Sequence, residues 1–321
     1  MNSKRWKKHI FSTLSFIVSG GLLYWIISKI DVTRTQHLLN EANASWLLIA
    51  LILAFGIPLL ATVRWLGVIR AQDILNIRPH VALRAVMLAM VLNSFLPSKA
   101  GDLAKVVFLK KHSGFSTSVG TVVLERLVDL FALGILGMVG FFWSGNVLGG
   151  YAASVLLGGV SATLLIITII PLHRIPISLH FQEAIKKIHM VCLNWLKNPL
   201  AILQTLAGSF GIWTINGMIV FSLVMALGAD HCWSYAISIF PVAVIAGQIP
   251  ISISGIGTRD SVFVLLLSVH LSFEEATLIA IGYTVFSYWL LSLICFPIIL
   301  LEIIKYFRSS DRINQRQLLK E

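Results

Sequence analysis

The sequence predicts an all-α polytopic membrane protein, on the evidence of its composition, its long apolar stretches and its charge distribution. Of the 321 residues, 57% are hydrophobic and only 12% are charged, about half the roughly 25% charged residues of soluble domains. This composition excludes a disordered chain, a coiled coil and an ordinary soluble globular domain. Because an apolar segment in lipid must satisfy its own backbone hydrogen bonds, each spanning segment is expected to be helical.

Six stretches reach the length of about 20 apolar residues that one membrane crossing requires. They cover roughly residues 10–30, 45–69, 116–143, 151–171, 200–228 and 276–304. The first stretch follows four basic residues, Lys4, Arg5, Lys7 and Lys8, and so resembles a signal peptide. It lacks a small-residue cleavage site, which predicts an uncleaved membrane anchor.

Two further apolar regions are interrupted and are each too short for one full crossing. Residues 81–96 end at Pro97, and a second short apolar run follows as far as Leu109. Residues 233–249 end at Pro250, and the run Ser261–His270 follows. We expect two re-entrant helical hairpins, each entering and leaving by the same face of the membrane. The alternative is a protein with eight full spans.

The charged residues between the apolar stretches favour six crossings plus two hairpins. That arrangement places nearly all basic residues on one side: Lys4–Lys8, Arg70, Arg78, Arg84, Lys110, Lys111, Arg174, Lys186, Lys187, Lys197 and Lys305–Lys320. The other side carries Lys29 and Arg34 against five acids: Asp31, Glu41, Asp230, Glu274 and Glu275. Basic loops stay cytoplasmic, so we expect a protein of the cytoplasmic (inner) membrane with both termini and the basic tail 305–321 inside. Eight full spans would place Lys110 and Lys111 outside.

This arrangement divides the single membrane domain, residues 1–321, into two halves of opposite orientation. Residues 10–143 and 151–304 would each hold two helices, a hairpin and a helix. A weak sequence echo supports the repeat, since Asp102 and Asp260 each precede a Phe by 13 residues, at Phe115 and Phe273. Interrupted segments at matching positions of two halves indicate a transport site near the bilayer midplane. The alternative is chance, because proline-kinked helices are common in membranes.

The stretch 116–143 contains three charged residues, Glu125, Arg126 and Asp129. A charge inside a spanning helix costs at least about 2.5–3.5 kcal/mol, so these residues are functional candidates. Arg126 and Asp129 are three apart and can pair, which leaves Glu125 in need of a partner on another segment. The candidate partners are Arg64, Lys99 and Arg259. A structural ion-pair network that only locks the helices together is the alternative.

Each interruption has the chemistry of an anion site. Pro97 and Pro250 end helices, and glycine permits unusual backbone shapes at Gly101, Gly255 and Gly257. A short helix that starts after such a break offers free backbone N–H groups to an anion, here beside Lys99 or Arg259. Asp102 and Asp260 would either cap these helices or contact a substrate.

The remaining motifs favour neither a metalloenzyme nor a hydrolase. The cysteines, Cys192, Cys232 and Cys295, are far apart and predict no disulfide framework. The nine histidines are scattered, without zinc-site spacing, and no nucleophile motif is present. We therefore expect no cofactor, no metal and no nucleic-acid partner, and a transporter rather than an enzyme.

Three motifs together resemble the membrane domain of the lysylphosphatidylglycerol synthases and flippases. They are Asn93-x-x-x-Pro97-Ser98-x-x-Gly101-Asp102, Glu125-Arg126-x-x-Asp129, and Pro250-x-Ser252-x-x-Gly255-x-Gly257-x-Arg259-Asp260. The resemblance covers about residues 10–305, although the family pattern usually has Glu where this chain has Asp102 and Asp260. Fused members of the family carry a soluble aminoacyl-transferase domain. This chain stops at Glu321, so the resemblance implies translocation rather than synthesis.

We therefore expect a translocator that moves a membrane phospholipid or a lipid-linked amphiphile between leaflets. Arg64, Lys99, Arg126 and Arg259 would hold the headgroup. The full set of expected binding or gating residues is Arg64, Asn93, Lys99, Gly101, Asp102, Glu125, Arg126, Asp129, Ser252, Gly255, Gly257, Arg259 and Asp260. One alternative is a membrane-embedded transferase that acts on a lipid headgroup, with Glu125 or Asp129 as general base. Another is a non-catalytic partner of an envelope-lipid enzyme.

Overall fold

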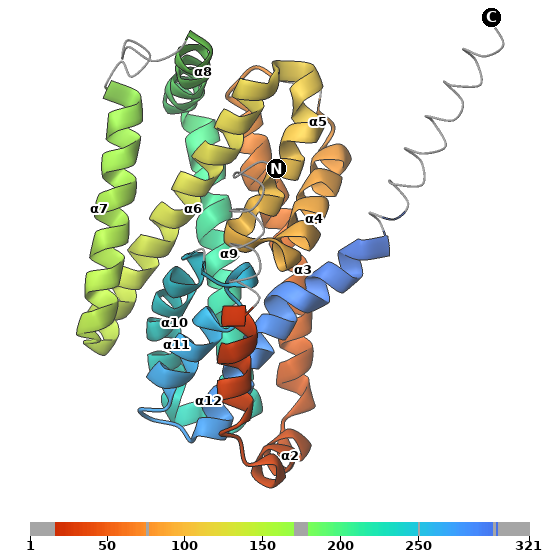
Figure 1. Ribbon diagram of the computed structural model, residues 1–321, viewed down its shortest axis with the longest axis vertical. Helices are drawn as coiled ribbons and strands as arrows, with labels where there is room; N and C mark the ends of the chain where they lie inside the picture. Colours follow the sequence, from red (N-terminus) through yellow and green to blue (C-terminus); the bar gives the residue numbers. More distant parts are fainter. Residues whose placement is uncertain (1–16, 75–76, 170–178, 250, 298–299, 301–321) are drawn as a thin grey trace, which may run out of the picture.

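The described residues form helices joined by turns and no strands, as the sequence predicts (Figure 1). The computed structural model describes residues 17–74, 77–169, 179–249, 251–297 and 300. The helices are Ile17–Ile27, α2 (Val32–Glu41), α3 (Ala44–Arg70), α4 (Pro79–Phe95), α5 (Ala104–Ser113), α6 (Phe115–Ser144), α7 (Val147–Ile169), α8 (Leu179–Leu196), α9 (Pro199–Ala226), α10 (Trp233–Gln248), α11 (Thr258–Leu267) and α12 (Phe273–Thr284). Short turns connect them: η1 (Pro97–Leu103), η3 (Asp230–Cys232) and η4 (Ile253–Gly255), while η5 (Val285–Trp289) is a π-helical turn that continues α12. The start of the first predicted span, Pro250 and the tail 305–321 lie outside the described residues.

Four of the described helices are long and apolar enough to cross a membrane: α3, α7, α9 and the helix Phe273–Pro297 that begins with α12. This finding supports an integral membrane protein but does not confirm all six predicted crossings. The described part of the first predicted span, Ile17–Ile27, is a shorter apolar helix. The predicted crossing 116–143 forms α6, which has 30 residues.

The two long helices α3 and α9 pack along each other in the middle of the bundle. Glycine makes this close approach possible, because a Cβ atom at Gly208 of α9 would lie 2.7 Å from the Cβ of Arg64 on α3. Small residues let helices approach closely inside membranes, where the hydrophobic effect does not drive helices together. The contact fixes Arg64 at the centre of the bundle.

The opposite side of α3 is an exposed apolar stripe. Leu48, Ile52, Phe55, Leu59 and Val63 recur every three or four residues and are all exposed. A soluble protein rarely leaves so long an apolar face in water. This face therefore fits a helix that contacts lipid.

The interrupted regions form two helical hairpins that approach from opposite ends of the bundle (Figure 1). In the first hairpin α4 runs to the middle of the bundle, η1 turns, and α5 returns to the end at which α4 began. In the second hairpin α10, η4 and α11 do the same from the other end. The two tips, η1 and η4, are in contact with each other.

The glycines of the tips allow the backbone to pack closely. A Cβ atom at Gly101 would lie 2.5 Å from the backbone nitrogen of Asn93, so only glycine lets η1 fold back onto α4. Gly255 has a φ of +76°, and a Cβ there would lie 2.9 Å from the carbonyl oxygen of Gly247. The structure thus gives Gly101 and Gly255 packing roles at the turns.

The two ends of the bundle differ in charge. The end that holds α8 and the outer end of the α4–α5 hairpin carries basic residues (Figure 1), among them Arg70, Arg78, Arg84, Lys110 and Lys111. The opposite end, with α2 and the outer end of the α10–α11 hairpin, carries Lys29 and Arg34 against five acids: Asp31, Glu41, Asp230, Glu274 and Glu275. This separation of charge matches the arrangement of loops that the sequence predicts.

Candidate functional site

Charged side chains from α3, α5 and α6 meet inside the bundle. Glu125 accepts hydrogen bonds from Arg64, with 2.7 Å between Oε1 and Nη2, and from Lys105, with 2.8 Å between Oε2 and Nζ. Asp129 lies one turn further along α6 and accepts from the second Nη of Arg64 and from Arg126, at 3.1 Å. The two carboxylates share one face of α6 because they are four residues apart.

Asp102 joins this group from η1. Its carboxylate is ion-paired with Arg126, lies 3.4 Å from the Nζ of Lys105, and accepts a hydrogen bond of 3.2 Å from the amide of Asn93. We call Arg64, Asp102, Lys105, Glu125, Arg126 and Asp129 the buried charge network. It balances three carboxylates against three cations, and all but Arg126 are fully buried. Buried charges need such pairing to offset their loss of hydration, so the network holds α3, α6 and the first hairpin together.

The pairing agrees with the sequence in part. The predicted Arg126–Asp129 pair is present. Of the three candidate partners for Glu125, Arg64 is the one that binds it, and Lys99 and Arg259 make no ion pair with it. The second partner, Lys105, was missed. Its signal was its position three residues after Asp102, in a short apolar run that contains no other charge.

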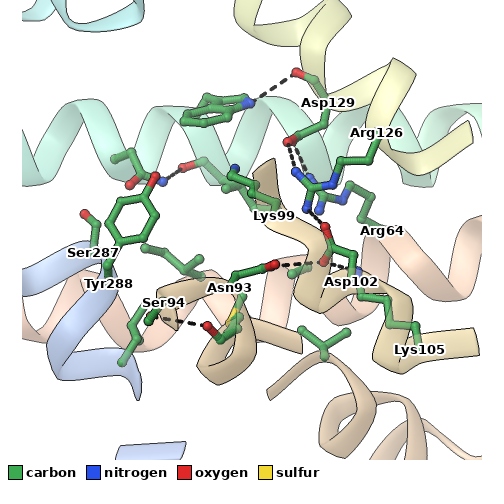
Figure 2. Close-up of a pocket in the computed structure, with 18 residues that line it drawn as sticks. Arg64, Asn93, Ser94, Lys99, Asp102, Lys105, Arg126, Asp129, Ser287 and Tyr288 are labelled. Atoms are coloured by element: carbon green, nitrogen blue, oxygen red, sulfur yellow. Dashed lines mark hydrogen bonds and ion pairs between the residues drawn. The ribbon is translucent and has the colours of Figure 1, made fainter. Parts of the chain in front are cut away.

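A polar cavity opens beside the network, between the first hairpin and helices α3, α6 and α9 (Figure 2). It has a volume of about 90 Å³. Its labelled residues in Figure 2 are Arg64, Asn93, Ser94, Lys99, Asp102, Lys105, Arg126, Asp129, Ser287 and Tyr288. Glu125 does not line the cavity. Five expected site residues other than Lys99 therefore share one cavity: Arg64, Asn93, Asp102, Arg126 and Asp129.

Lys99 differs from the other cations of the cavity. Its Nζ lies 5.3 Å from the centroid of the Trp213 ring, and among the described residues no carboxylate lies within 4 Å of it. Its backbone has a φ of +53°, which is unusual for a residue other than glycine. The cavity is thus lined by four cations, Arg64, Lys99, Lys105 and Arg126, and by two carboxylates, Asp102 and Asp129.

Arg126 has a polar atom without a partner in the described part of the chain. The Nε–H of Arg126, which lines the cavity, is buried and lacks a hydrogen-bond acceptor among the described residues. A buried donor without an acceptor is costly. An anion in the cavity would accept from Arg126 and offset the charge of Lys99.

The second tip contributes a separate ion pair. Arg259 donates to Asp260 at 3.1 Å and to Thr284, and its guanidinium lies 4.2 Å from the ring centroid of Tyr288. Lys99, Arg259 and Tyr288 together line a smaller cavity beside the first. The structure therefore brings the two basic residues of the tips together, with Tyr288 lining both cavities.

The two aspartates of the tips do different things. Asp260 accepts a hydrogen bond of 3.0 Å from the backbone N–H of Gly257, so it stabilises the start of α11 as a cap would. The capping alternative is wrong for Asp102, because its side chain bonds to Arg126, Lys105 and Asn93 rather than to a helix start. This difference follows from the 3₁₀ geometry of η1, which places Asp102 inside the turn.

The other expected residues of the second tip lie around the turn. Ser252 bonds to Thr258 through their hydroxyl oxygens, 2.6 Å apart. Gly257 has a φ of +89°, and Gly255 packs on Gly247. Five of the expected site residues line neither of the two cavities: Gly101, Ser252, Gly255, Gly257 and Asp260.

Sequence reasoning also missed two aromatic residues of the cavity, Trp213 and Tyr288. Trp213 lies in the middle of α9, away from the helix ends where membrane tryptophans are common, and that position was the available signal. Tyr288 lies in the π-helical turn, which no feature of the sequence predicts. Within the described residues, no three His, Cys, Asp or Glu side chains lie close enough to hold a metal ion.

Comparison with known proteins is consistent with this architecture. A family model described as the lysylphosphatidylglycerol synthase TM region matches residues 12–295. A UPF0104 membrane protein of Methanocaldococcus jannaschii is 27% identical over 244 residues, which cover 72% of this chain and 97% of that protein. A UPF0104 membrane protein of Methanothermobacter thermautotrophicus is 24% identical over 289 residues, covering 80% of this chain and 85% of that protein.

Proposed function

Because this chain is an integral membrane protein that belongs to the family of the lysylphosphatidylglycerol synthase TM region, we propose that it moves an anionic or zwitterionic phospholipid between the two leaflets. The headgroup phosphate binds in the polar cavity, against Lys99 and Arg126. The observation that carries this proposal is the ammonium of Lys99, which lacks a carboxylate partner among the described residues.

The cost of an unpaired charge in the membrane is the physical reason for a phosphate to bind beside Lys99. A cation in the centre of a bilayer costs at least about 2.5–3.5 kcal/mol, and a phosphate would provide the missing negative charge. The volume of about 90 Å³ equals roughly three water molecules, enough for a phosphate group but not for a whole lipid. Passage of a lipid therefore requires the two hairpin tips to separate.

The charged ends of the bundle support an orientation in the membrane that is part of this proposal. The basic end faces the cytoplasm, so both termini are cytoplasmic and the protein lies in the cytoplasmic membrane. The α4–α5 hairpin then re-enters from the cytoplasmic side and the α10–α11 hairpin from the outside. With six full crossings, this arrangement buries the irregular tips in protein at the depth where lipid would leave their backbones unsatisfied.

The order of elements supports an inverted repeat of residues 10–143 and 151–304. Helix Ile17–Ile27, α3, the α4–α5 hairpin and α6 correspond to α7, α9, the α10–α11 hairpin and α12. The corresponding helices α3 and α9 pack together at the centre. In such repeats, rocking of one half against the other exposes a central site to each side in turn.

The transferase alternative would use Glu125 or Asp129 as general base, and both of these carboxylates are already paired. Glu125 contacts both Arg64 and Lys105, and Asp129 contacts both Arg64 and Arg126. A general base must reach a substrate proton within hydrogen-bond distance, and Glu125 does not line the cavity. The geometry therefore supports translocation better than transfer, and it offers no specific support for a purely non-catalytic partner.

A leaflet-resolved assay tests the proposal. The purified protein is placed in vesicles of phosphatidylethanolamine and phosphatidylglycerol that contain a fluorescent phosphatidylglycerol, and a membrane-impermeant reductant bleaches the outer leaflet. Lys99→Gln should slow translocation about ten-fold or more, because a hydrogen bond to a charged group contributes about 1.5–3 kcal/mol. Lys110→Gln is the matched control, since Lys110 is exposed at the end of the same hairpin. Translocation no faster than in protein-free vesicles would contradict the proposal.

A further inference from the structure

A larger, apolar cavity lies next to the polar one, between α6, α9 and α10. We call it the α6–α9–α10 groove; its volume is about 310 Å³ and its lining is almost entirely apolar. Trp213 lines both this groove and the polar cavity. The charged and the apolar cavities are therefore neighbours that share one side chain.

The groove is open to the surroundings of the bundle and has free space inside. Its outer residues Val139, Trp143 and Met218 are exposed. Gly217 lines the groove and is buried, yet a Cβ atom built there would meet no other atom within 4 Å. A buried position with open space beside it shows that side chains do not fill the groove.

The depth of the groove fits one leaflet. Its lining on α10 runs from Trp233 to Pro241, about 12 Å at 1.5 Å per residue. Half of the hydrocarbon core of a bilayer is about 15 Å. Trp143 and Trp233 line the groove near the C-terminal end of α6 and at the start of α10, where tryptophans commonly mark the membrane interface.

We propose that the α6–α9–α10 groove holds one acyl chain of the phospholipid whose phosphate binds in the polar cavity, with Trp213 as the partition between the two. This inference rests on the proposed function and adds the site for the tail. The Nε1–H of Trp213 donates to the backbone oxygen of Asp129 at 3.2 Å, while its ring faces Lys99. The N–H of the indole is therefore satisfied inside the protein, and the ring lies between the ammonium of Lys99 and the apolar groove.

The size of the groove distinguishes an acyl chain from a partner helix. A helix with its side chains is at least about 10 Å across, so over the depth of one leaflet it would fill several times the 310 Å³ of the groove. A single hydrocarbon chain is much narrower than a helix, and it needs no hydrogen-bond partners from the lining. The groove also adjoins, across Trp213, a cavity with an excess of positive charge, which suits an anionic amphiphile.

Photolabelling in vesicles tests the site. The probes are a phosphatidylglycerol and a diacylglycerol that carry the same diazirine near the end of one acyl chain, in vesicles of phosphatidylethanolamine and phosphatidylglycerol. After illumination, peptide mass spectrometry measures labelling of residues 213–218 and 233–241. The phospholipid probe should label these segments about ten-fold more than the diacylglycerol, and Lys99→Gln should remove that preference.

Gly217→Leu should lower the labelling of the groove about ten-fold, because the new side chain fills the space of the acyl chain. Gly158→Leu is the matched control. Gly158 lies on α7, outside the groove, and a Cβ there also meets no atom within 4 Å. The labelling of Gly158→Leu should stay at the parent level.

The outcomes separate this inference from the proposed function. Equal labelling by the two probes, or labelling that survives Gly217→Leu, would show ordinary lipid at the protein surface or another occupant and would overturn the acyl-chain site. Translocation that still depends on Lys99 would then leave the proposed function intact. Groove labelling that responds to Gly217→Leu, in a protein that translocates nothing, would keep the lipid site and overturn the transport.

Discussion

Replacing Glu125 by Gln should destabilise the folded protein strongly. The Glu125 carboxylate has no exposed surface and accepts four hydrogen bonds from Arg64 and Lys105. The amide would remove the negative charge and leave the network with three cations and two carboxylates. Removing one partner of a buried ion pair costs about 3–5 kcal/mol, so the free energy of unfolding should fall by about that amount.

The measurement is unfolding in mixed detergent micelles, followed through the loss of helical circular dichroism. Glu183→Gln is the control, because Glu183 is exposed on α8 and should change the free energy of unfolding by less than about 0.5 kcal/mol. Combining Glu125→Gln with Lys105→Gln restores the balance of charge. The double variant should therefore be more stable than the sum of the two single changes predicts, by about 0.5–3 kcal/mol.

If the free energy of unfolding of Glu125→Gln lies within about 1 kcal/mol of the parent value, this reasoning is refuted. Removing one partner of a buried ion pair should cost more than that. A double variant with strictly additive effects would refute the direct pairing of Glu125 with Lys105. The first result would make Glu125 an acid without an effective partner, whereas the second would leave Arg64 as its partner.

Three further predictions concern the tips and the membrane orientation. Gly101→Ala should destabilise the protein by about 1–3 kcal/mol or more in the same unfolding assay, because its methyl group would meet the backbone of Asn93; unchanged stability would contradict the packing of η1 on α4. Ser254→Gly should raise the melting temperature, because Ser254 has a φ of +55° and left-handed backbone costs about 1–3 kcal/mol outside glycine; a lower melting temperature would contradict it. A cysteine placed at Asp230 should react with an impermeant thiol reagent from outside while one at Lys110 should not; outside labelling of position 110 would contradict the re-entrant first hairpin.

Hydrophobic length and charge predicted much of the fold because both act along the sequence. The apolar stretches predicted the helices, and the breaks at Pro97 and Pro250 predicted the short segments on either side of each tip. The uneven distribution of charge among the loops predicted that basic and acidic residues lie at opposite ends of the bundle. The number of complete crossings is harder to predict, because a helix such as α6 carries charges that are paired only in three dimensions.

The site was predicted less completely, for a reason that lies in the geometry. The charges of α6 stood out because a charge is costly at membrane depth. Which cation is paired and which is free depends on how the hairpin turns, and a 3₁₀ turn at η1 places Asp102 and Lys105, rather than Lys99, against α6. Neighbours from distant segments, such as Trp213 and Tyr288, leave no periodic signal in one sequence.

The most direct test of the central claim is translocation of phosphatidylglycerol by variants that change only the charge at position 99. The series is Lys99→Arg, Lys99→Gln and Lys99→Glu, each measured in the leaflet-resolved assay beside the parent protein. If the ammonium holds the phosphate, Lys99→Arg should keep most of the rate, Lys99→Gln should lose about ten-fold, and Lys99→Glu should lose more because like charges repel. Equal rates across the series would contradict an anion site at Lys99.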